Sequence, residues 1–234
     1  MAAEAPPNPT FSDSGWQLGK PDLEFVVRDP FDVPADGEDI YRYFVIPMDL
    51  AGDLDVVAFD FQPGDVAVVH HCIAYVDDSG WARKEDAKDK APGFAVFDNT
   101  NGLYESAGRD EIAAIGGWAP GSQAYLLPEG YGMKIPKGGD LVLEIHYHLT
   151  GKATRDRSRC ALYLAKNPIR RWVEGLVIGT ETLAIPAGEG SYWRHVPMKL
   201  PAAMELLDIG PHMHFLGKDV EVRATLPTAP SKAF

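Results

Sequence analysis

Six of the seven histidines in this 234-residue chain fall in three tight clusters. Imidazole is the commonest metal ligand in proteins and suits copper, zinc, iron and nickel. Because no matching cysteine pairs accompany them, the clusters predict metal-binding chemistry based on imidazole. The remaining histidine, His195, is isolated and is interpreted as an ordinary core or surface residue. The clustered histidines are His70 and His71, His146 and His148, and His212 and His214.

The segment 141–149 alternates like a β-strand with one buried face. Its odd positions are apolar and include Tyr147, which is therefore assigned to the core. Glu144, His146 and His148 share the other face. That face could simply be the solvent side of an antiparallel strand, but two imidazoles and a carboxylate favour metal ligands with a supporting partner.

His70 and His71 are adjacent, so in a regular strand their side chains point to opposite faces. Sharing one ion would require a β-bulge or the use of different ring nitrogens. In the alternative, His71 packs in the core beside Val69 and Ile73 while His70 is exposed. The spacing alone leaves both possibilities open.

His212 and His214 share a face of the segment 209–216 and could hold a metal at two points. Met213 is turned away from that face, which makes it a poor third ligand. Pro211 indicates a strand edge or a bulge, where a ligand could reach the site.

Short apolar runs separated by glycine and proline predict an all-β protein of antiparallel sandwich type. The charge-rich stretch 81–91 is interpreted as a solvated loop rather than a short helix. Asn167-Pro168 suggests a boundary between residues 1–166 and 167–234, and the second part is small for a complete sandwich. The expected strands are 23–28, 40–47, 54–61, 66–76, 141–149, 159–165, 172–178, 181–185, 192–198, 204–209 and 220–226.

The formal net charge of −12, from 22 basic and 34 acidic residues, argues against binding to nucleic acid or to an anionic membrane. No apolar run is long enough to span a membrane, and residues 1–15 do not resemble a signal peptide. Cys72 and Cys160 are expected to be buried thiols or to form one disulfide, and not to bind the metal.

The chain resembles the type II copper, ascorbate-dependent monooxygenases, the family of dopamine beta-monooxygenase and peptidylglycine alpha-hydroxylating monooxygenase, and most closely their bacterial relatives. The resemblance covers nearly the whole chain in the family's order. It rests on GWQLGKPD at 15–22, VVHHCIAYVDD at 68–78, GGWAPG at 116–121, LPEGYGMKIPKGGDLVLEIHYHLTGK at 127–152 and PHMHFLGK at 211–218.

The resemblance implies two jelly-roll domains that face each other across a cleft, each with one copper ion. His70, His71 and His146 would bind the electron-storing copper. His212 and His214 would bind the oxygen-activating copper and carry the catalytic step, together with a methionine. The implied reaction is hydroxylation of a C–H bond in a small molecule or peptide by O2, with electrons from ascorbate or another donor. His148 would support the first site, and Glu144 is either such a support, an electron-path residue or an exposed carboxylate.

This sequence has no counterpart of the family's methionine ligand. The resemblance therefore implies a chain with an incomplete second jelly roll, holding one or two copper ions, and a fragment of a longer protein exported to the periplasm or secreted. The alternatives are a non-catalytic module that binds one copper, or an inactive fragment. A cupin-like iron or zinc enzyme is disfavoured because its HxH motif with a downstream Glu and His in one domain is absent.

Overall fold

The computed structural model describes residues 15–95, 112–175, 178–179, 183–200, 202–211, 213, 217–225 and 232–233. Contacts within the chain divide it into two compact units, Met1–Leu183 and Ala184–Phe234. The first unit extends past the predicted boundary at residue 166 because the chain continues into β11 (Arg171–Trp172), which pairs with β7 (Tyr131–Ile135). The division into jelly-roll domains 1–166 and 167–234 stays a prediction.

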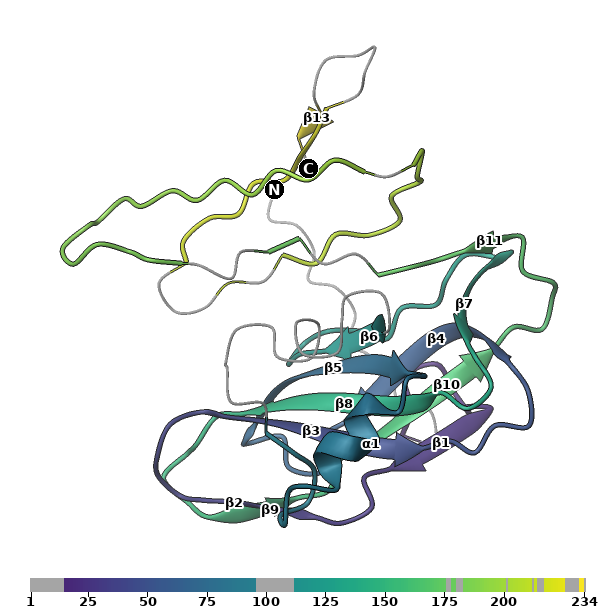
Figure 1. Ribbon diagram of the computed structural model, residues 1–234, viewed down its shortest axis with the longest axis horizontal. Helices are drawn as coiled ribbons and strands as arrows, with labels where there is room; N and C mark the ends of the chain where they lie inside the picture. Colours follow the sequence, from purple (N-terminus) through teal and green to yellow (C-terminus); the bar gives the residue numbers. More distant parts are fainter. Residues whose placement is uncertain are drawn as a thin grey trace, which may run out of the picture. The chain divides into compact units, whose positions relative to one another are not determined.

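The first unit is a β-sandwich, which confirms the predicted all-β class (Figure 1). One sheet has the order β1-β10-β4-β7-β11, formed with β1 (Leu23–Val26), β10 (Arg159–Leu164) and β4 (Leu54–Gln62). The other has the order β3-β8-β5-β6, from β3 (Ile40–Pro47), β8 (Asp140–Tyr147), β5 (Val69–Asp77) and β6 (Ile112–Trp118). A small separate pair joins β2 (Phe31–Val33) to β9 (Thr154–Asp156).

The core lies between the two sheets and follows the predicted alternation. On β8 the side chains of Leu141, Leu143, Ile145 and Tyr147 are fully buried in it, as expected from their odd positions. The opposite face of β8 carries Val142, Glu144 and His146. Both cysteines are free and buried in this core, so the buried-thiol alternative holds in the structure.

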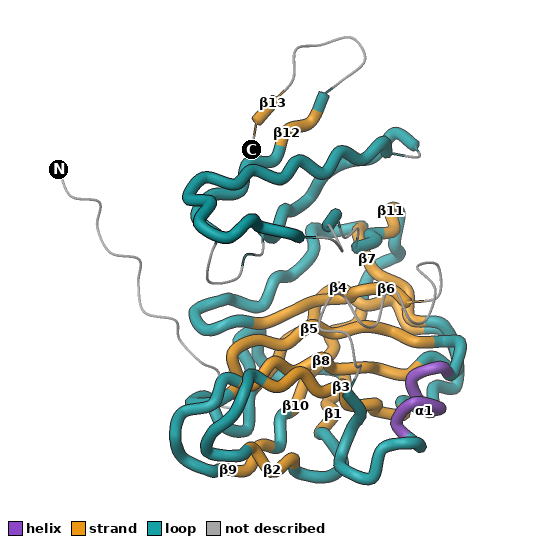
Figure 2. The backbone as a smooth tube through the Cα atoms, turned by 60° about the vertical axis from the view of Figure 1, so that its left-hand side comes forward, coloured by secondary structure: helices purple, strands orange, loops and turns teal. Residues whose placement is uncertain are grey.

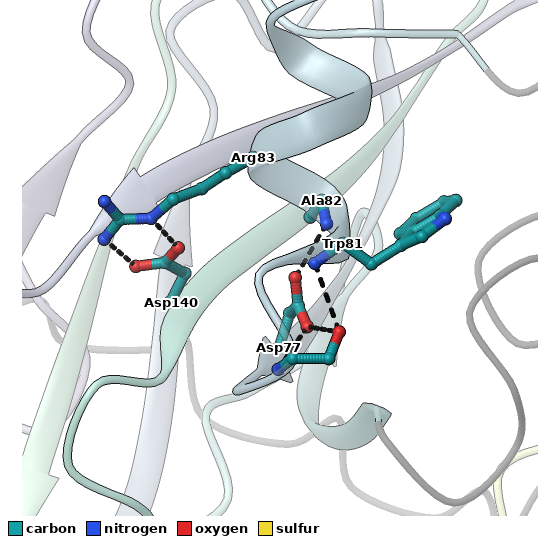
Figure 3. A network of polar contacts seen from close by, with 6 residues as sticks. Asp77, Trp81, Ala82, Arg83 and Asp140 are labelled. Atoms are coloured by element: carbon teal, nitrogen blue, oxygen red, sulfur yellow. Dashed lines mark hydrogen bonds and ion pairs between the residues drawn. The ribbon is translucent and has the colours of Figure 1, made fainter.

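A short helix, α1 (Trp81–Asp86), occupies part of the stretch predicted as a solvated loop, so that prediction is wrong. The helix is fixed by buried carboxylates at the paired ends of β5 and β8 (Figure 3). Asp77 accepts a hydrogen bond of 2.7 Å from the backbone N–H of Ala82, and Arg83 forms an ion pair with Asp140. Some of the charged residues in 81–91 anchor the helix and others are solvated. Composition alone does not distinguish these two roles.

Helix α1 covers a second apolar cluster on the outer face of the β3-β8-β5-β6 sheet. Tyr43, Tyr75 and Phe94 belong to this cluster with Ala82 of the helix. The rings of Tyr43 and Phe94 stack with centroids 5.3 Å apart. Part of the outer face of this sheet is therefore covered, and the histidines lie further along strands β5 and β8.

In the second unit, the described residues form little regular structure (Figure 2). Among these residues, the one strand pair joins β12 (Arg223–Ala224) to β13 (Lys232–Ala233). The strands predicted at 192–198 and 204–209 are not present, and β11 replaces the longer strand predicted at 172–178. A strand needs a neighbouring strand to pair its backbone N–H and C=O groups. An apolar run in the sequence does not by itself provide that partner. Among the described residues, no helix is long and apolar enough to cross a membrane.

Candidate metal centre

Three predicted histidines meet where β5 and β8 lie side by side. His70 and His71 come from β5 and His146 from β8, and one ring nitrogen of each lies within 4.8 Å of the others. His71 and His146 are buried, with exposed fractions of 8% and 5%, whereas His70 is exposed. The centre is thus reachable from solvent on the His70 side.

A β-bulge lets the two adjacent histidines approach the same point. In the pairing of β5 with β8, Val69 lies opposite Tyr147 and His71 lies opposite His146, so His70 is the extra residue. This bulge is the irregularity that two adjacent histidines of a strand need if they are to bind one ion. It also excludes the alternative in which His71 packs in the core, because His71 lies on the His146 side of the sheet.

Two of the three distances between the ring nitrogens match those between ligands that share one metal ion. The Nδ1 atom of His71 lies 3.1 Å from Nδ1 of His70 and 3.3 Å from Nδ1 of His146. Two imidazole nitrogens at about 2.0–2.1 Å from one ion are separated by about 2.9 Å at a right angle and about 3.4 Å at the tetrahedral angle. Both observed distances fall within this range.

Hydrogen bonding alone accounts poorly for these contacts. A ring nitrogen has one in-plane orbital, which either carries a proton or accepts one. Nδ1 of His71 therefore cannot make two good hydrogen bonds, one to each neighbouring Nδ1. A cation that accepts all three lone pairs satisfies the nitrogens together.

A carboxylate that the sequence analysis missed lies beside the triad. Asp39 Oδ2 is 3.0 Å from His146 Nε2, and Asp39 Oδ1 is 2.9 Å from Nδ1 of His148. Burial raises the pKa of Asp39, but the hydrogen bonds and charges of the two imidazoles outweigh it and leave that pKa below its ordinary value. His148 itself is half exposed and lies outside the triad.

Glu144 lies on the His146 face of β8, as predicted, but it is not a freely exposed carboxylate. The hydroxyl of Tyr75 donates a hydrogen bond of 3.0 Å to Glu144 Oε2. Burial raises the pKa of Glu144, and the tyrosine hydrogen bonds oppose this effect. Glu144 is therefore held by tyrosines of the apolar cluster under α1.

The remaining candidate residues are placed differently. His212 and His214 lie outside the described residues, so their arrangement stays a prediction. Met213 and His195 are exposed. Within the described part of the chain, the one group of His, Cys, Asp and Glu side chains with metal-binding geometry is the triad, which includes neither cysteine.

Comparisons with known proteins identify no family. A scan against protein-family models and a search of curated proteins both gave no match. The fold and the site together define an all-β sandwich protein with a possible metal centre of three histidines.

Proposed function

We propose that this chain binds copper at His70, His71 and His146 and belongs to a copper-dependent monooxygenase that hydroxylates a C–H bond with O2 and ascorbate or an equivalent reductant. The observation that carries the proposal is the convergence of the three imidazoles, with Nδ1 of His71 3.1 and 3.3 Å from its neighbours. The resemblance to the monooxygenase family supports it, since the predicted ligands of the electron-storing copper are these three residues.

The donor set favours copper over the harder cations. The three donors are imidazole nitrogens, without carboxylate oxygens of the kind that magnesium and calcium prefer. Among divalent first-row metals, nitrogen sites bind copper most tightly. Iron and zinc also accept imidazole, so the metal must be identified by measurement.

The roles of the chain's own residues follow from this arrangement. The triad would hold the ion, and bound copper would supply the one-electron redox step. The exposed side of His70 would admit the electron donor. His212 and His214 are proposed to hold the second copper, at which O2 and the substrate react, and the substrate is a small molecule or a peptide.

A second candidate is a module that binds one copper and catalyses nothing by itself. It is favoured by the position of the triad, whose three ligands all belong to the first unit. In this case copper binding would be independent of His212 and His214.

Elemental analysis after copper loading and desalting tests the metal site. We expect His146→Ala to abolish binding at the first site, because it removes one of three ligands, with the fold retained by circular dichroism. His195→Ala is the matched control, since His195 is exposed. Unchanged copper content in His146→Ala, or tight Fe(II) binding without affinity for copper, would contradict the proposal.

The double variant His212→Ala/His214→Ala separates the two functions. Loss of a second copper, together with ascorbate-driven O2 uptake that yields a hydroxylated product in the unmodified chain, supports the monooxygenase. If the unmodified chain binds a single copper and gives no coupled hydroxylation, and the double variant keeps that copper, the redox module is supported.

A further inference from the structure

We propose that Asp39 is a positioning residue of the metal centre: its carboxylate fixes the tautomer and orientation of His146, and His148 fixes the carboxylate. This role rests on the proposed copper site. Asp39 and His148 are not themselves ligands of the ion, and only the fold brings Asp39 beside the two histidines.

The first step is the tautomer of His146. A carboxylate is only an acceptor of hydrogen bonds, so Nε2 of His146, 3.0 Å from Asp39 Oδ2, must carry the proton. In the neutral ring the lone pair then resides on Nδ1. That atom is the one 3.3 Å from Nδ1 of His71, so the lone pair faces the centre of the triad. Without Asp39, either nitrogen of His146 could carry the proton.

The second step is the orientation of the ring. Tyr41 lies opposite His146 in the pairing of β3 with β8, and the two rings stack with centroids 4.2 Å apart and an angle of 11°. Stacking fixes the plane of the imidazole but permits a half-turn about the Cβ–Cγ bond, which exchanges ring nitrogens with ring carbons. The hydrogen bond from Nε2 to Asp39 determines this rotation, and the two contacts together leave one orientation.

The third step explains the position of His148. Ile40 pairs with Tyr147, so extending the register by one residue brings Asp39 beside His148. The His148 backbone N–H donates a hydrogen bond of 2.8 Å to Val68 O, and its ring lies 2.9 Å from Asp39 Oδ1. Each oxygen of Asp39 therefore contacts one imidazole. His148 thus holds the carboxylate against His146 rather than binding the ion.

A carboxylate that orients a metal-bound histidine typically contributes about 10- to 100-fold to metal affinity. We therefore expect Asp39→Ala to weaken Cu(II) binding by about that factor, measured by competition with a chelator. The electron paramagnetic resonance spectrum of the copper-loaded Asp39→Ala variant should show more than one Cu(II) species, because His146 can then coordinate through either nitrogen. Such heterogeneity would not follow from a general loss of stability.

Two further variants sharpen the test. Asp39→Asn keeps an oxygen that accepts a hydrogen bond from Nε2, so it should restore a single Cu(II) species and most of the affinity. His148→Ala should weaken binding less than Asp39→Ala does. Glu38→Ala is the matched control, because it removes an exposed carboxylate one residue away.

The outcomes distinguish this proposal from the proposed function. If the unmodified chain binds no copper, the copper site itself is wrong. If copper is bound and is lost in His146→Ala, but Asp39→Ala keeps the affinity within twofold and the spectrum unchanged, only the role of Asp39 is overturned. A loss in His148→Ala equal to that in His146→Ala would overturn it too, because His148 would then be a ligand.

Discussion

The chemical state of the two cysteine side chains is decided by burial in the sandwich core. Burial raises the pKa of the Cys72 and Cys160 thiols well above their ordinary values. The thiolate is the reactive form, so a raised pKa keeps both groups neutral and unreactive until the pH exceeds that value. Cys72 directly follows a predicted ligand, yet it lies on the core side of β5.

We expect neither thiol of the folded protein to react with a chromogenic disulfide reagent at about pH 8, and both to react after unfolding in denaturant. Copper loading should leave the folded protein's result unchanged, because neither cysteine belongs to the triad. Rapid reaction of one thiol in the folded chain that copper suppresses would contradict this assignment.

Single residues also show which features of the site can be predicted from the sequence and which cannot. The period of two on β8 correctly separates Leu143 and Ile145 from Glu144 and His146, because burial of one face dictates it. Asp39 could not be found in this way. It is 107 residues from His146, and only the register of β3 on β8 makes them neighbours.

At the scale of elements, helix α1 depends on the ion pair between Arg83 and Asp140. The Asp140 side chain is 2% exposed and that of Arg83 is 50% exposed, so removal of the arginine leaves a buried carboxylate without its partner. We expect Arg83→Ala to lower the free energy of unfolding by about 1–3 kcal/mol, less than for a fully buried pair. Urea unfolding measures this, and Lys84→Ala on the same helix should change it by less than about 0.5 kcal/mol. Equal effects would show that the ion pair is not what anchors α1.

The turn before Phe94 gives a second test, through two glycines that have the same φ angle. Gly80 and Gly93 both have a φ of +71°, but a Cβ at Gly93 would lie 2.6 Å from Tyr43 O, whereas no atom lies within 4 Å of one at Gly80. Both alanine variants should lose about 1–2 kcal/mol from the left-handed conformation. Gly93→Ala should lose more, because Tyr43 and Phe94 exchange two backbone hydrogen bonds of 2.9 Å there. Equal midpoints of denaturation for the two variants would contradict this.

The elements show a similar limit of prediction. Most of the strands that line the core were predicted, because alternation and turn residues both mark them, but β6 and β7 were missed. Helix α1 was not predicted, since its anchors Asp77 and Asp140 come from two strands that are far apart in the sequence. The bulge at His70 could be stated as a requirement of metal binding, but no local sequence signal placed it there.

At the scale of the whole molecule, the two units differ in how much they bury. The core clusters consist entirely of residues from the first unit, and the described residues of the second are exposed or partly exposed. The apolar runs of residues 192–209 therefore predicted strands that the described structure lacks. Trp193 is 75% exposed, which shows that apolar composition there is not matched by burial within the unit.

This difference predicts the course of limited proteolysis. Segments with few buried contacts open most readily, so chymotrypsin should cut first among the exposed sites of 184–225, which include Tyr192 and Trp193. The resistant product should end near Leu183 and keep one copper, because His70, His71 and His146 all belong to the first unit. Mass spectrometry and elemental analysis of that product measure both properties. If the intact chain binds two coppers and the product one, the second ion belongs to the removed segment, as expected for His212 and His214. A resistant product without copper, from a chain that binds it when intact, would show that the triad alone does not hold the metal.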